Sequence, residues 1–156
     1  MKTFRTILAC AVALAAPAHA QKVCSNADNI AAEKAIERVV NWPTLRKAYV
    51  DYKHCDTGKV EDLFTDAMMR LMVGWKNIDA VAADYSRDAD YKAWITKHLM
   101  SDAAKDDRED VFALAKKNCP KGQDAFCAEL MDIVRPVKNE PLKPLNLDPL
   151  PKIKAQ

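Results

Sequence analysis

Glycine is scarce in this chain. Only three of its 156 residues are glycine, and they are far apart: Gly58, Gly74 and Gly122. Phosphate-binding loops and dinucleotide-binding fingerprints need closely spaced glycines, because the backbone must approach the phosphate groups. The sequence therefore argues against nucleotide-dependent chemistry on those scaffolds.

Residues that support nucleophilic catalysis are also few. Beyond residue 20 the chain has two histidines, His54 and His98, and three serines: Ser25, Ser86 and Ser101. Each serine is explained by a helix cap or a turn. His98 falls on the inward face of a predicted helix, which favours a core histidine. His54 follows a predicted helix, where a cation interacts favourably with the helix dipole. We predict no catalytic residue.

Beyond residue 20 there is no excess of charge of either sign. The whole chain has 24 basic and 22 acidic residues, and the two excess cations are Lys2 and Arg5. Residues 21–156 therefore carry 22 of each sign. A neutral protein has no electrostatic reason to bind nucleic acid or anionic lipid, so we expect neither as a partner.

The first twenty residues have the pattern of a secretory signal peptide. A basic start precedes an apolar run at 6–16, and the small residues Ala18 and Ala20 follow it. We expect cleavage before Gln21, and a protein that is periplasmic or secreted. The alternative is a lipoprotein signal that ends at Cys10, although no polar tether follows that residue. The apolar run is shorter than the about 20 residues that span a bilayer.

Removal of that leader leaves an even set of cysteines: Cys24, Cys55, Cys119 and Cys127. An even number in an exported chain predicts disulfides. Of the three possible pairings, the topology favours Cys24–Cys55, at the meeting ends of a helical hairpin, and Cys119–Cys127, across a short loop. No C-x-x-C pair is present, and we predict neither a metal site nor a cofactor.

Apolar residues recur at helical spacing, and no stretch alternates convincingly at period two. The clearest run, 60–75, repeats at intervals of three and four residues. The predicted helices are 26–40, 42–52, 60–75, 78–85, 89–99, 102–119 and 124–135. Ser25, Asn77, Asp88 and Ser101 are predicted N-caps. We therefore predict an all-α fold at 21–135: a compact bundle of six or seven short helices, arranged as hairpins on the third helix and cross-linked by two disulfides.

Residues 136–156 differ from the rest, because prolines alternate there with large aliphatic residues. Regular prolines prevent a helix, which predicts an extended C-terminal tail. Three interpretations stay open: the tail packs back over apolar surface of the body, it binds a partner, or it is free.

Two further patterns allow a chemical and a structural interpretation. Met68 and Met72 are four residues apart and carry soft thioether ligands for copper(I), but both belong to an apolar stripe, which favours core packing. Acidic residues cluster at 102–110, where Asp102 and Asp106 are predicted to share a helical face. A solvated helix start explains them better than paired catalytic carboxylates do.

These features favour a non-enzymatic binding protein of the cell envelope, most simply an inhibitor or immunity-type protein that occludes a partner such as an envelope-acting toxin. A homo-oligomer is a variant of this hypothesis. The alternatives are a stress chaperone or metal-responsive sensor, and a small carboxylate-dependent hydrolase. Candidate contact residues are aromatic, because aromatic side chains concentrate binding energy: Trp42, Tyr49, Tyr52, Tyr85, Tyr91 and Trp94. Most of them are expected in the core, with one or two as surface anchors.

Overall fold

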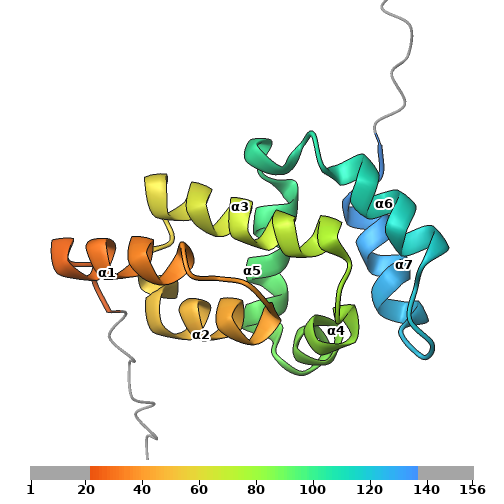
Figure 1. Cartoon of the computed structure of the whole chain (residues 1–156), viewed down its shortest axis with the longest axis horizontal. Coiled ribbons are helices and arrows are strands. Elements are labelled where there is room, and N and C mark those ends of the chain that lie inside the picture. The colour runs from red at the N-terminus through yellow and green to blue at the C-terminus, as the bar shows by residue number, and fades with distance from the viewer. Residues whose placement is uncertain (1–21, 137–156) are drawn as a thin grey trace, which may run out of the picture.

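The computed structural model describes residues 22–136 (Figure 1). Within that range the chain forms seven α-helices, two short 3-10 helices and no strand, which confirms the predicted all-α class. The elements are α1 (Asn26–Ile36), α2 (Trp42–Tyr52), η1 (Lys53–Cys55), α3 (Gly58–Gly74), α4 (Ile78–Arg87), α5 (Ala89–Met100), η2 (Asp102–Ala104), α6 (Arg108–Lys117) and α7 (Asp124–Ile133). The predicted leader and the tail beyond Pro136 lie outside the described residues. None of the helices within 22–136 has the length and apolar character that a membrane crossing requires.

Successive helices pair as hairpins around α3, as the sequence predicts. α1 packs on α2, α4 on α5 and α6 on α7, while α3 contacts α1, α2, α5 and α6 (Figure 1). The apolar stripe of α3 explains this central position, because it buries Phe64, Met68 and Met72 completely. The prediction that both methionines pack in the core is confirmed.

Side-chain caps fix where several helices begin. The Ser25 hydroxyl accepts from the backbone N–H of Asp28, and the Asp28 carboxylate accepts from that of Ser25, which is the predicted start of α1. The Asp88 carboxylate caps α5 by accepting from Tyr91 N–H at 3.0 Å, also as predicted. Asn41 and Thr44 form a second reciprocal cap at α2, which was not predicted.

Two predicted helix boundaries are wrong by four residues or more, whereas the others lie within two residues of the observed bounds. The first of the two is the end of the first helix. α1 ends at Ile36. The N–H of Glu37 still bonds four residues back, to Glu33, but those of Arg38 and Val39 bond three residues back, to Ala35 and Ile36. The tighter turn directs Val39 inward and leaves Val40 74% exposed, so Val40 is not on the predicted inward face.

The predicted start of the sixth helix is also wrong. Ser101 makes no side-chain cap, and η2 separates it from α6, which begins at Arg108. The Arg108 guanidinium donates to the carbonyls of Leu99 and Ser101, and this holds the connection as a separate turn. Asn77 occupies the N-cap position of α4, but its left-handed backbone (φ 49°) leaves its side chain without a capping hydrogen bond.

Both predicted disulfides are confirmed. Cys24, just before α1, bonds to Cys55 at the end of η1, with a Cα–Cα distance of 4.9 Å. Cys119 bonds to Cys127 across the α6–α7 loop, with a Cα–Cα distance of 6.0 Å. The first bond brings the start of α1 to the end of the α1–α2 hairpin, where the most promising surface feature lies.

Candidate functional site

An open groove of about 560 Å³ lies between α2, η1 and α5, and we call it the α2–α5 groove. Its lining combines aromatic, aliphatic and charged side chains: Lys22, Tyr49, Val50, Asp51, Lys53, His54, Asp90, Ala93 and Trp94. Pockets that mix an apolar wall with a few polar groups are the common form of binding sites.

Two aromatic residues form the rigid part of the groove. The rings of Tyr49 and Trp94 lie 5.1 Å apart, and Trp94 also stacks on Tyr91 at 5.6 Å and meets Phe64 edge-on at 5.2 Å. This packing fixes their orientation. Within residues 22–136 the buried indole N–H of Trp94 has no hydrogen-bond partner.

Val50 is the exposed apolar residue at this site. Its side chain is 57% exposed and lines both the α2–α5 groove and a second groove of about 460 Å³ between α2 and α4. Charged pairs stand around it, with Lys47 2.6 Å from Asp51 and Lys53 3.9 Å from Asp90. An apolar centre inside a charged rim is the usual anatomy of a protein interface.

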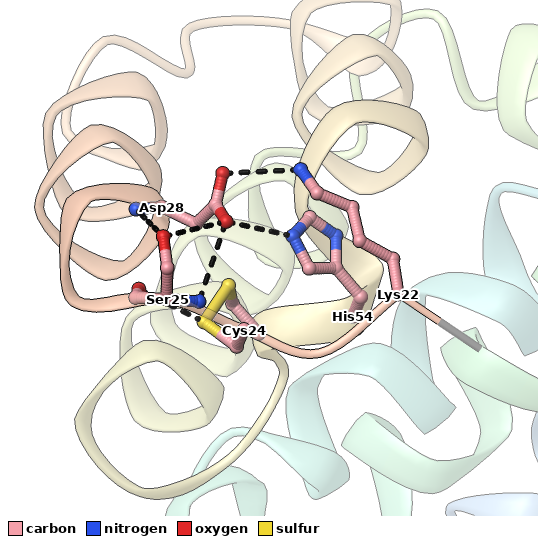
Figure 2. Close-up of polar contacts among 6 residues, drawn as sticks. Lys22, Cys24, Ser25, Asp28 and His54 are labelled. Atoms are coloured by element: carbon pink, nitrogen blue, oxygen red, sulfur yellow. Dashed lines mark hydrogen bonds and ion pairs between the residues drawn. A yellow bond between two sulfur atoms is a disulfide. The ribbon is translucent and has the colours of Figure 1, made fainter. Parts of the chain in front are cut away.

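Polar contacts fix the chain at the N-terminal side of the groove (Figure 2). The Asp28 carboxylate accepts hydrogen bonds from the Ser25 hydroxyl at 2.8 Å and from the Lys22 ammonium at 3.1 Å. It lies 3.7 Å from His54 Nε2, beside the Cys24–Cys55 bond. The bonds from Ser25 and Lys22 hold the pKa of Asp28 well below its ordinary value. These contacts place Lys22 and His54 at the groove.

A second polar network lies beneath Tyr49 and Trp94, the two aromatic residues of the groove. His98 is fully buried; its Nε2 lies 3.2 Å from a carboxylate oxygen of Asp56, and its Nδ1 lies 2.7 Å from the Thr65 hydroxyl. Lys97 also donates to Asp56, at 3.0 Å. Burial alone would raise the pKa of Asp56, but the bonds from His98 and Lys97 outweigh it and hold that pKa below its ordinary value. His98 is therefore the satisfied core histidine that its position predicted.

A hydroxyl, an imidazole and a carboxylate meet in this network, as in a hydrolytic triad, but their position in the fold suits a structural role. A catalytic hydroxyl must reach the substrate. The Thr65 side chain is 1% exposed, its hydroxyl donates to the Glu61 carbonyl one turn earlier, and neither Thr65 nor His98 lines the α2–α5 groove. The network instead joins α3, α5 and the residue after η1.

The six candidate aromatic residues differ in their burial and in the surface that they border. Trp42, Tyr49, Tyr85, Tyr91 and Trp94 are buried, and Tyr52 is half-buried. Tyr49 and Trp94 line the α2–α5 groove, and Trp42 lines the neighbouring groove between α2 and α4. Tyr85 packs against Phe126 of α7 with ring centroids 5.2 Å apart. Tyr52, the last residue of α2, lines another hollow between α1 and α2, so four of the six candidates border the surface of α2.

The acidic cluster is confirmed as solvated. Asp102, Asp106, Glu109 and Asp110 are exposed. The predicted shared helical face of Asp102 and Asp106 is wrong, because Asp102 lies in η2 and Asp106 in the turn before α6. In the described part of the chain, no three His, Cys, Asp or Glu side chains are grouped so as to hold a metal ion.

Three residues of the groove and the network were not predicted: Val50, Asp56 and Thr65. Val50 had a local signal, because it is an aliphatic residue outside the inward stripe of its helix. Asp56 and Thr65 had none, since they lie 42 and 33 positions from the histidine that they contact.

No protein-family model matches the chain, and neither a curated protein nor a solved structure matches it. Function is therefore inferred from the groove and its surroundings.

Proposed function

We propose that this is an exported, non-enzymatic binding protein of the cell envelope, which occludes a protein partner as an inhibitor or immunity protein does. The contact surface is the exposed side of α2 with the two grooves beside it. The observation that carries the proposal is Val50, a 57% exposed aliphatic residue placed between two hollows whose walls include Trp42, Tyr49 and Trp94.

The energetics of association favour such a surface. Binding is dominated by a few well-packed residues near the centre of an interface, and ordering mobile side chains weakens it. Here the aromatic residues are already immobilised, and the Cys24–Cys55 bond fixes the N-terminal side. A partner that inserts an apolar side chain beside Val50 therefore orders little of this protein on binding.

One observation and one prediction support the cell envelope as the compartment. Disulfides such as Cys24–Cys55 and Cys119–Cys127 persist in oxidising compartments and are rare in the cytosol. The predicted secretory leader, with cleavage before Gln21, points to the same compartment.

Capture of the partner tests the proposal. Affinity-tagged protein is retrieved from the envelope fraction of its own organism as wild type, Val50→Asp and Val40→Asp. Val40 is the matched control, because it is 74% exposed and lines neither groove. We expect one exported protein to be retained by the wild type and by Val40→Asp, and to be reduced at least about tenfold by Val50→Asp, since a charge in an apolar interface centre costs more than about 1.4 kcal/mol.

The second stage measures inhibition. Stoichiometric addition of the wild type should suppress the activity of the captured protein, and Val50→Asp should not. Equal capture by all three variants, or an unaffected partner activity, would contradict the proposal.

The two alternative functions have less support. Met68 and Met72 are fully buried, so a copper-binding role would require unpacking the core. The aspartates with shifted pKa values, Asp28, Asp56 and Asp88, are all shifted downward by their hydrogen-bond partners. A hydrolytic general acid needs the opposite shift.

A further inference from the structure

A third groove lies between α5 and α7, next to the α2–α5 groove, with which it shares Ala93. This α5–α7 groove has a volume of about 530 Å³, and its lining is largely apolar or small: Ala89, Lys92, Ala93, Thr96, Lys97, Met100, Glu129 and Ile133. Met100, at the end of α5, is 63% exposed. The Lys92–Glu129 ion pair, 2.5 Å long, bridges the two helices. Met100 is therefore a large apolar side chain with little covering it in the described part of the chain.

The chain leaves the described region beside this groove. α7 ends at Ile133, which lines the groove, and the described residues end at Pro136. Residues 137–156 therefore start four positions after a groove residue. Covalent attachment of this kind gives a segment an effective concentration in the millimolar range at a nearby surface, so a weak contact suffices to hold it.

The large apolar residues of that segment recur at a spacing that would place them together against an apolar groove. Leu147, Leu150 and Ile153 are spaced by three, and prolines at 149 and 151 favour a polyproline II backbone. Because that helix has three residues per turn, these three side chains share one face. They span roughly 19 Å at about 3.1 Å per residue, and α5, at about 1.5 Å per residue, is roughly 18 Å long.

The intervening residues provide the necessary reach. An extended segment 137–146 covers about 30 Å at about 3.1 Å per residue. This exceeds the length of α5, so the chain has room to turn back along the groove.

We propose that residues 147–153 occupy the α5–α7 groove of their own chain, with Leu147, Leu150 and Ile153 against the surface formed by Ala93, Met100 and Ile133. This inference does not depend on the proposed function, because no residue of α2 lines the α5–α7 groove and Ala93 is its only residue in common with the α2–α5 groove. It assigns the tail to a contact within the molecule and leaves Val50 free for a partner.

Methyl NMR of the intact protein tests this contact. The Met100 methyl signal is compared between the wild type and Leu147→Asp/Leu150→Asp, with the buried Met68 methyl as internal reference. The matched control, Asn146→Asp/Lys152→Gln, makes the same change in net charge on another face of the segment. We expect the Met100 signal to shift in the first variant only, with Met68 unchanged in both.

A photocrosslink identifies where the tail lies. A benzophenone amino acid in place of Leu150 should crosslink within the monomer to α5 or α7, at a yield independent of protein concentration. An unmoved Met100 signal, crosslinks to other helices, or crosslinks only between two chains would each overturn the proposal.

Discussion

The N-terminal and C-terminal parts of the molecule hold their helices together by different means. In the α1–α3 region the disulfide joins residues 31 positions apart, and the Asp56–His98 contact ties this region to α5 across 42 positions. In the α6–α7 region the disulfide spans 8 positions and closes one loop between neighbouring helices. The α2–α5 groove lies beside the longer of the two cross-links. A surface built from distant segments needs such cross-links, whereas a hairpin needs only its loop.

The entropy of the unfolded chain makes this difference measurable. In the chain-entropy description, a cross-link over 31 positions stabilises the folded state by about 3.7 kcal/mol, and one over 8 positions by about 2.5 kcal/mol. The predictions below test whether the two regions differ in this way.

The largest effect is expected from removing the long-range disulfide. Cys24→Ser/Cys55→Ser should lower the free energy of unfolding by about 3–4 kcal/mol, because the unfolded chain regains the conformational entropy that the cross-link removes. Urea unfolding followed by circular dichroism measures it. The variant should also lose order at the groove, since Lys22 and His54 lie beside this bond.

Removing the short-range disulfide should cost less. Cys119→Ser/Cys127→Ser is expected to lower the same free energy by about 2–3 kcal/mol and to leave the α2–α5 groove intact. A loss equal to or greater than that of the first variant would abolish the proposed contrast between the two regions.

The buried Asp56 should make stability depend on pH. Its pKa is lowered in the folded state, so its stabilisation is present above the ordinary value of 3.8 and is lost as the pH falls below it. Asp56→Asn should cost about 2 kcal/mol at pH 7, since hydrogen bonds to a charged group are lost. The difference from wild type should shrink below pH 4. Urea unfolding at pH 7 and pH 3 measures it, and a difference that persists at pH 3 would contradict this role.

The smallest effect concerns the cap of α1. Ser25→Ala removes the hydroxyl that accepts from Asp28 N–H and should cost about 1 kcal/mol. Its matched control is Ser86→Ala, because the Ser86 hydroxyl only donates to a carbonyl within its own helix, that of Ala82 at 2.8 Å. In thermal unfolding, Ser25→Ala should melt at a lower temperature than Ser86→Ala. Equal melting temperatures would contradict a capping role for Ser25.

Local patterns predicted most of the fold. The apolar spacing predicted the helix that became α3, and the caps Ser25 and Asp88 were correct because a cap is decided within four residues. The disulfide pairing followed from hairpin topology. The wrong boundaries, at Val40 and Ser101, arose where a tightened turn and the Arg108 side chain override local preference.

The site was less predictable than the fold. Aromatic type suggested Tyr49 and Trp94, but the same reasoning also selected Tyr85, which packs against Phe126 in the core. Whether a buried aromatic residue borders a groove depends on how α2, η1 and α5 meet, which sequence spacing does not encode. Asp56 and His98 come into contact only when the chain folds, because they lie 42 positions apart.

Hydrogen exchange in the complex tests the central claim most directly. Backbone exchange is compared between the free protein and its complex with the captured partner. Binding through the α2 surface predicts slower exchange in α2 and in the part of α5 around Ala93 and Trp94, with α6 and α7 unchanged. Protection confined to α6 and α7, with α2 exchanging as in the free protein, would contradict it.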